Sequence, residues 1–271
     1  MENKMTAEKC SSCVKEPTDT INTARFIQKL DDYFSRNDLE GAGECLLYWE
    51  KEARGLGDLR GLLTVRNEEI GFYRRTGEED KGREAIVEAI ELIQQLELEE
   101  NLSGAVIYVN IATTLKAFGS AKEGMPYYEK ADKIYQRQNK THIYEYAALL
   151  NNQASAYQDL EMFQQAKTYY GRAITILKDL GTHDGEIAVS LINLAHTTFD
   201  ADGESYDEVE ILLDEAWEYL NSPRQPRDGN YAFILSKCAP SLEYFGRDMQ
   251  ARAARTVAEE IYEDTIGAEV L

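Results

Sequence analysis

Apolar side chains recur along the chain with the spacing of one face of a helix. The first run carries Phe26, Ile27, Leu30, Tyr33 and Phe34, which follow the i, i+3, i+4, i+7, i+8 pattern of an amphipathic helix. Side chains available to cap the start of this helix are Thr18, Asp19 and Thr20. Because similar runs return throughout, the pattern predicts an all-α chain.

Small residues recur at a fixed period, which indicates an internal repeat. Ala112, Ala154 and Ala195 occupy equivalent places in three similar segments, spaced by 42 and then 41 residues. An alanine on the buried face of a helix lets another helix approach the backbone closely. Ala166 and Ala173 repeat this feature on the helix that follows Ala154. The repeats are therefore expected to pack as pairs of helices.

Six copies of a two-helix unit fit this period. Each copy contains a short polar or glycine-containing turn between its two helices. These turns are predicted at Asn37-Asp38, Thr76-Gly77, Gly119, Leu160-Glu161, Asp202-Gly203 and Gly246. A helix pair that cannot bury its apolar face alone must stack on its neighbours, so the chain is predicted to form a solenoid.

The repeats resemble the tetratricopeptide repeat family. Ala154 and Tyr157 match the G-x2-Y element of its motif, Ala166 and Tyr170 match the A-x3-F element, and Ala173 matches the last alanine. The run 193–195, with the letters NLA, is similar to the longer-period, kinesin-light-chain-like branch of the family. The resemblance implies a right-handed α-solenoid of about six helix-turn-helix repeats.

The expected domain organisation is one solenoid with short tails. Residues 1–20 are predicted to be a disordered tail, 21–265 the solenoid, and 266–271 a second tail. The repeats are expected at 24–57, 63–96, 105–138, 147–180, 188–223 and 232–265. The segment 221–229, which contains two prolines, is expected to be a connecting loop, with a hinge as the alternative.

The net charge of the chain argues against two classes of binding partner. The 271 residues include 29 basic and 49 acidic side chains, a formal net charge of −20 that repels nucleic acid and anionic membranes. No apolar run is long enough to cross a bilayer and no signal peptide is recognisable, so we expect a cytoplasmic protein. The pair Cys10 and Cys13 is expected to be two reduced thiols, with a redox pair or a shared metal as alternatives.

Catalytic motifs are missing from the sequence. It contains no phosphate-binding GxxxxGK[ST], no GxGxxG after a strand, no HExxH and no GxSxG. Three histidines, His142, His183 and His196, are too far apart to form a compact metal motif. We therefore predict a non-enzymatic protein with no cofactor and no metal, although a catalytic set assembled across repeats remains an alternative.

The family resemblance places the binding surface on the first helix of each pair, which lines a concave groove. Transferring its inward-facing positions selects a set rich in basic and amide side chains. The candidate site residues are Arg36, Asn67, Arg74, Arg75, Asn110, Thr113, Lys116, Asn151, Asn152, Ser155, Asn193, His196 and Lys237. Asparagine recurs at one place in three copies, at Asn110, Asn152 and Asn193. These amides either bind the backbone of an extended peptide or hydrogen-bond the neighbouring repeat.

The predicted function is a scaffold or adaptor that docks a partner protein or peptide, with an acidic segment favoured by the basic side chains. One alternative is a regulatory peptide sensor of the bacterial receptor type, which the short segment before the first repeat disfavours. Another alternative is a structural subunit that forms a homodimer. Tyr108, Tyr144 and Tyr146 are expected near the groove or the loops, where tyrosine suits recognition.

Overall fold

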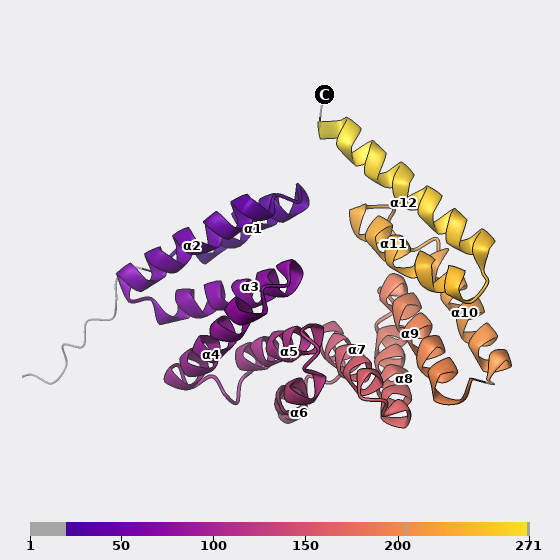
Figure 1. Cartoon of the computed structure of the whole chain (residues 1–271), viewed down its shortest axis with the longest axis horizontal. Coiled ribbons are helices and arrows are strands. Elements are labelled where there is room, and N and C mark those ends of the chain that lie inside the picture. Colours follow the sequence, from indigo (N-terminus) through magenta and orange to yellow (C-terminus); the bar gives the residue numbers. More distant parts are fainter. Residues whose placement is uncertain (1–19, 204, 270–271) are drawn as a thin grey trace, which may run out of the picture. The chain divides into compact units, whose positions relative to one another are not determined.

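The protein is described from a computed structural model that covers residues 20–203 and 205–269, without the side chains of 264–269. Twelve α-helices form in these residues (Figure 1). They are α1 (Thr23–Ser35), α2 (Leu39–Leu56), α3 (Leu59–Thr76), α4 (Glu79–Gln95), α5 (Leu102–Ala117), α6 (Ala121–Arg137), α7 (Tyr144–Asp159), α8 (Phe163–Leu180), α9 (Asp184–Asp202), α10 (Tyr206–Leu220), α11 (Gly229–Tyr244) and α12 (Asp248–Glu269). The described residues therefore form an all-α repeat solenoid, as the sequence predicted.

The helices are joined in six pairs by tight turns at the predicted places. The residue that follows each first helix or its cap has a left-handed backbone, with φ of 53° at Asn37, 58° at Glu161 and 66–78° at the glycines. These glycines are Gly77, Gly119, Gly203 and Gly246. Glycine adopts this conformation without steric cost, which explains why the turns could be located from the sequence.

The chain divides into two compact units. The first ends at Glu99 and contains α1–α4, and the second begins at Glu100 and contains α5–α12. The predicted tail 1–20 lies outside the described residues except for Thr20, and so do Cys10 and Cys13. The last helix continues to Glu269, four residues beyond the predicted end of the solenoid.

Alanine and glycine are buried where helices cross, as the repeat pattern predicted. Ala112, Ala154 and Ala195 are all fully buried. In the third pair, a methyl group added to Gly124 of α6 would lie 2.8 Å from the main-chain oxygen of Ala112 in α5. Because no side chain fits there, the small residues set the close approach of the two helices.

The first helix is capped later than the sequence indicated. Asn22, rather than Thr18, Asp19 or Thr20, is the N-cap, and its side chain accepts a hydrogen bond from the Arg25 amide at 3.0 Å. The preceding residue, Ile21, is buried and donates its main-chain N–H to Asp58 at 3.0 Å. This long-range bond holds the chain in a non-helical conformation up to Asn22.

Candidate functional site

A cavity of about 420 Å³ opens in the second unit between three first helices of consecutive pairs, α7, α9 and α11. Leu177 of α8 forms part of its wall. The other lining residues are Tyr144, Ala147, Ala148, Asn151, Asn152, Glu186, Val189, Ser190, Asn230, Phe233 and Ile234. We call this cavity the α7–α11 pocket. It contains two residues of the predicted site, Asn151 and Asn152.

An apolar row runs through the pocket at one level of the repeats. The buried alanines at 112, 154, 195 and 239 fix the register, and the residue six positions before each of them is apolar. This row consists of Val106, Ala148, Val189 and Phe233. Val106 and Phe233 are 48% and 52% exposed, although both are large apolar side chains. Ala148 and Val189, between them, are partly buried, so the row is most exposed at its two ends.

A polar row follows about one helical turn later. The residue two positions before each buried alanine is Asn110, Asn152, Asn193 or Lys237. The three asparagines are partly exposed and Lys237 is exposed. We call the two rows together the first-helix face of the second unit. An amide side chain both donates and accepts, so this face offers both kinds of hydrogen-bonding group at a regular step.

The polar part of the pocket includes an unpaired acceptor and a carboxylate. Asn151 Oδ1 is buried and has no hydrogen-bond partner among the described residues. Glu186 is the charged side chain in the pocket lining, and its charge, after burial, raises the pKa of Tyr144. The Ser190 hydroxyl is already used, because it donates to the Glu186 main-chain oxygen at 2.8 Å.

Aromatic stacking and a loop hold the pocket rim in place. The Tyr144 ring stacks on His183, with ring centroids 4.6 Å apart. The predicted loop between α10 and α11 is anchored by Arg224, which donates to the buried Asp184 carboxylate at 2.8 and 3.1 Å. Both contacts fix the start of α9, the helix that carries Glu186.

Two predicted site residues make hydrogen bonds to the core. Thr113 and Tyr128 share a hydrogen bond of 3.0 Å between their hydroxyl groups, and Ser155 bonds to Tyr170 in the same way one repeat later. Both tyrosines are fully buried. A buried hydroxyl needs a partner, so these small polar residues satisfy the core of their own repeat.

Two other predicted residues of the second unit also have internal contacts. Lys116 lies 3.4 Å from the carboxylate of Asp159 in the following repeat. His196 packs against the rings of Tyr244 and Phe245, at 5.3 and 4.7 Å between centroids. Burial lowers the pKa of His196 and thus favours its neutral form.

The predicted residues of the first unit make contacts within that unit. Arg36 donates to the Asp32 main-chain oxygen at 3.0 Å, and Arg75 donates to Asn37 Oδ1 at 2.9 Å. Asn67 donates to the Glu68 carboxylate at 3.1 Å. Burial raises the pKa of Glu68, and the charge of Arg74 opposes this shift. The basic side chains expected to bind an acidic ligand are thus engaged locally.

Several pocket residues were not recognised from the sequence. Glu186, Val189 and Ser190 precede Asn193 by one or two turns on α9, and Asn230 and Phe233 stand in the same relation to Lys237 on α11. These residues could have been found by counting back from each predicted site residue towards the helix N-terminus, three or four residues at a time, because such positions share one helix face. Of the tyrosines expected near the groove, Tyr144 lines the pocket, whereas Tyr108 and Tyr146 are buried.

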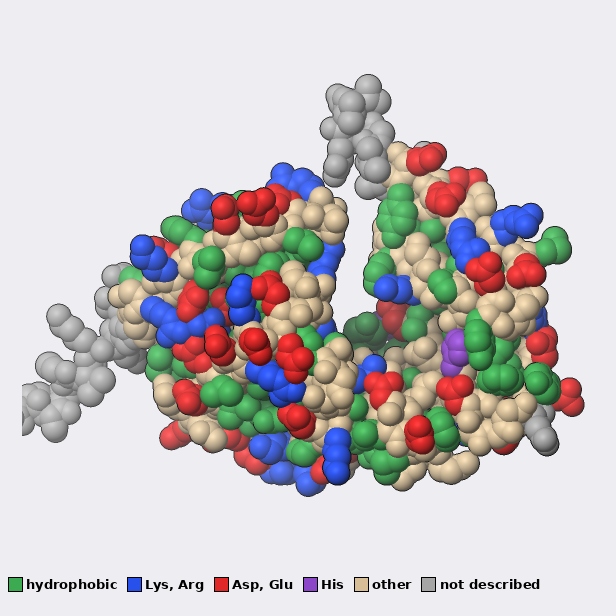
Figure 2. Space-filling view, in the orientation of Figure 1, with side chains coloured by type: hydrophobic (Ala, Val, Ile, Leu, Met, Phe, Trp, Pro, Cys, Tyr) green, Lys and Arg blue, Asp and Glu red, His purple; other side chains and the backbone are tan. Residues whose placement is uncertain are grey.

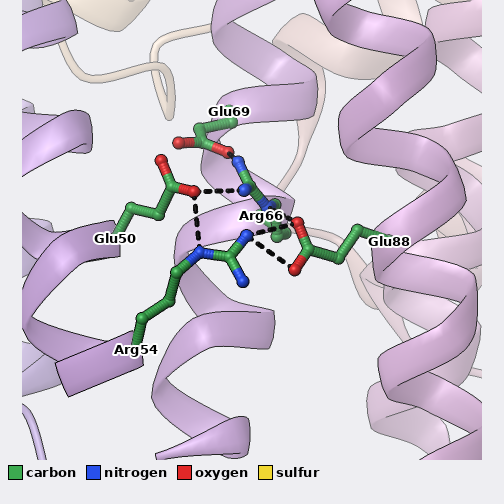
Figure 3. Close-up of polar contacts among 5 residues, drawn as sticks. All are labelled: Glu50, Arg54, Arg66, Glu69 and Glu88. Atoms are coloured by element: carbon green, nitrogen blue, oxygen red, sulfur yellow. Dashed lines mark hydrogen bonds and ion pairs between the residues drawn. The ribbon is translucent and has the colours of Figure 1, made fainter. Parts of the chain in front are cut away.

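A partly buried ion cluster connects three helices of the first unit (Figure 3). Arg66 of α3 is 12% exposed and bonds to Glu50 of α2, Glu69 of α3 and Glu88 of α4. Arg54 of α2 donates to Glu50 at 3.0 Å and to Glu88 at 2.7 Å. Because every side chain in the cluster meets an opposite charge, its geometry fits a structural role.

The described residues offer little for other kinds of chemistry. In 20–203 and 205–263, no group of three or more His, Cys, Asp and Glu side chains is placed to hold a metal ion. None of the described helices combines the length and the apolar character needed to span a bilayer. Figure 2 shows acidic and basic side chains intermixed on each unit, without an extended surface of one sign on the face drawn.

Comparison with known proteins identifies the repeats. The tetratricopeptide repeat pattern matches residues 105–138 and 147–178, which coincide with the pairs α5–α6 and α7–α8. These two helix pairs therefore match the tetratricopeptide repeat family. No curated protein sequence matches it significantly.

Solved structures show the same fold at low sequence identity. One solved structure contains kinesin-light-chain TPR-like repeats from Podosopora anserina that are nearly identical to one another. Its sequence is 18% identical to this chain, with a TM-score of 0.55 over 75% of this chain and 96% of that one. The apo form of RapI is 12% identical, with a TM-score of 0.60 over 91% of this chain and 100% of that one. A Rap protein complexed with Competence and Sporulation Factor is 14% identical, with a TM-score of 0.51 over 88% and 74%.

Proposed function

We propose that the protein is a non-enzymatic docking module that binds an extended segment of a partner protein or peptide on the first-helix face of its second unit. The observation that carries this proposal is the pair of rows that passes through the α7–α11 pocket. One row supplies exposed or partly exposed apolar side chains, and the other supplies three amides and the ammonium group of Lys237. An extended segment needs both, because it presents side chains and unpaired main-chain groups together.

The spacing between the first helices of neighbouring repeats suits a ligand with an extended backbone. Neighbouring packed helices lie roughly 8–10 Å apart, and an extended chain advances roughly 3.3 Å per residue. About three residues of ligand would therefore cross from one first helix to the next. From α5 to α9 the ligand backbone meets an asparagine of the polar row at each step, while its side chains meet the apolar row and the pocket.

The test is selection of ligands from a library of random twelve-residue peptides displayed on phage, followed by fluorescence polarisation with the purified chain. Ala148→Arg and Val189→Arg place a bulky charge in the apolar row, and we expect each to weaken binding about tenfold or more, roughly 1.4 kcal/mol. Gln165→Arg on the exposed face of α8 is the matched control, because it adds the same side chain away from the row.

The control should bind within about twofold of the wild type, a difference of less than roughly 0.5 kcal/mol. Circular dichroism must show the same helix content for all variants. Equal affinity of the wild type and both row variants would contradict the proposed surface. Failure of the library to yield any peptide that binds would contradict the proposed function.

A peptide sensor is the second candidate. The observation in its favour is the fold shared with a Rap protein, a protein solved in complex with Competence and Sporulation Factor. A sensor must change conformation on binding, whereas a scaffold need not. Small-angle scattering with and without a selected peptide distinguishes the two, because a changed radius of gyration supports the sensor. Multi-angle light scattering on the same samples tests the homodimer.

A further inference from the structure

We propose that the α7–α11 pocket selects a basic side chain, arginine or lysine, in the docked segment. This inference rests on the proposed function and names the chemistry of one residue of the ligand. It differs from the sequence-based expectation of an acidic ligand. The reason is that the charged side chain in the pocket lining, Glu186, is itself acidic.

Two acceptors of the pocket lining favour a ligand group that donates hydrogen bonds. Asn151 Oδ1 is buried without a partner, and an unpaired buried acceptor is costly. Ser190 has already donated its hydroxyl proton to the main chain. A guanidinium or ammonium group carries several N–H donors and no acceptor. It would serve Asn151 and the Glu186 carboxylate together, whereas a ligand carboxylate would be repelled by Glu186 and could not donate.

The apolar wall of the pocket fits the stem of the same side chain. Lysine and arginine bury their methylene groups on apolar surface while the charged end reaches a polar site. Val189 and the exposed ring of Phe233 provide that surface beside Glu186. Lys237 already lies with Nζ 5.4 Å from the Phe233 ring centroid. The ligand cation is therefore placed towards Glu186 and the Tyr144 ring, away from Lys237.

The net negative charge of the whole chain also favours a basic ligand. A formal charge of −20 raises the local concentration of cationic segments and speeds their association. A basic residue in the ligand would thus gain long-range attraction as well as the local contacts. An acidic segment would have to overcome repulsion before it reached the pocket.

Three capped amino acids separate these chemistries: N-acetyl-arginine amide, N-acetyl-norleucine amide and N-acetyl-glutamate amide. Each is titrated into the intact chain carrying ¹³C-labelled alanine and valine methyl groups. We expect the arginine compound to shift Ala148 and Val189 at lower concentration than norleucine, and the glutamate compound to leave both methyl groups unchanged. Equal or stronger shifts with norleucine or glutamate would overturn the proposal.

Matched variants assign the effect to the pocket. Glu186→Gln keeps the size of the side chain and removes its charge, so it should weaken arginine binding roughly fivefold through loss of a charge-assisted hydrogen bond. Glu218→Gln removes an exposed charge from α10 and should leave binding within about 1.5-fold, because it lies outside the pocket lining. Equal binding by both variants would contradict the role of Glu186.

The library selection separates failure of this inference from failure of the proposed function. Selected peptides that lose affinity in Val189→Arg, but show no preference for arginine or lysine at any position, would refute the basic-residue proposal and leave the docking face intact. Peptides enriched in one basic residue whose binding is insensitive to Glu186→Gln would also refute it. Loss of the preference in Glu186→Gln is the supporting result.

Discussion

At the scale of single residues, the turns inside the helix pairs differ in the conformational free energy that their left-handed residue costs. Four of these six turns use glycine for the left-handed position, whereas the fourth pair uses Glu161 with φ of 58°. A side chain in this conformation costs roughly 1–2 kcal/mol, partly offset because glycine loses more entropy on folding. Glu161 makes its hydrogen bond through the backbone, from its N–H to the Gln158 oxygen at 2.9 Å.

Replacement of Glu161 by glycine is therefore expected to stabilise the protein. Glu161→Gly keeps the main-chain bond and removes the strain, which should raise the free energy of unfolding by about 0.5–1 kcal/mol. Urea denaturation followed by circular dichroism measures the change. Gly119→Ala, at the equivalent turn of the third pair, is the control and should shift stability the opposite way. A lower urea midpoint for Glu161→Gly would show that its side chain stabilises the turn.

Individual side chains also show where prediction from the sequence stopped. The buried alanines and the turn residues were found because their backbone requirements restrict residue type. Thr113 and Ser155 were assigned to a ligand surface, yet each bonds to a buried tyrosine of its own repeat. Their sequence spacing fits both roles, since a residue at the edge of a helix face can turn its hydroxyl either way. The bonds to tyrosine became visible only in three dimensions.

At the scale of helices, the ion cluster of the first unit joins α2, α3 and α4 at a cost. Burial, only partly opposed by Arg66, raises the pKa of Glu69 from 4.5 to about 7. Its side chain is 1% exposed, and Glu69 Oε1 has no hydrogen-bond partner among the described residues. The folded protein thus binds a proton that the unfolded chain releases at lower pH. Stability is expected to fall as the pH rises from 4.5 through 7.

Glu69→Gln isolates this contribution. Glutamine resembles the protonated carboxyl group and does not titrate, so the variant should lack the part of the pH dependence that arises from Glu69. Between pH 4.5 and 8, the wild type should lose roughly 3 kcal/mol of unfolding free energy relative to the variant. Urea titrations at several pH values measure this difference, with Glu91→Gln as an exposed control on α4. A constant difference across the range would show that Glu69 stays ionised.

Helix positions were predictable from the sequence, whereas the groups that helices bring together were not. The six turns and the buried alanines fixed each helix pair. Neither the cluster around Arg66 nor the lining of the α7–α11 pocket forms a sequence motif, because each draws its members from several helices. On α9 the predicted site residues also began too far along the helix, so they included Asn193 and missed Glu186, two turns earlier. Both the ion cluster and the pocket depend on contacts between repeats, and the sequence pattern of a single repeat does not show such contacts.

At the scale of the whole molecule, a repeat architecture limits how far a perturbation spreads. The principal contacts in the described chain join helices that are consecutive in sequence, or first helices of adjacent pairs. In such solenoids stability is approximately a sum of repeat and nearest-neighbour terms. The separation into units at Glu99 and Glu100 follows the same rule. The unit that carries the first-helix face should therefore be able to lose structure locally.

Hydrogen exchange tests this local behaviour. Leu213 of α10 is fully buried, and Leu213→Ala should cost about 2–5 kcal/mol. We expect mass spectrometry to show faster amide exchange in α9–α12, with α1–α4 nearly as protected as in the wild type. Leu30→Ala in α1, also at a buried site, should give the reciprocal pattern. Equal acceleration in all helices, from either variant, would mean that the chain unfolds as one cooperative unit. In that case ligand binding at the α7–α11 pocket would protect α1–α4 as strongly as the helices it touches.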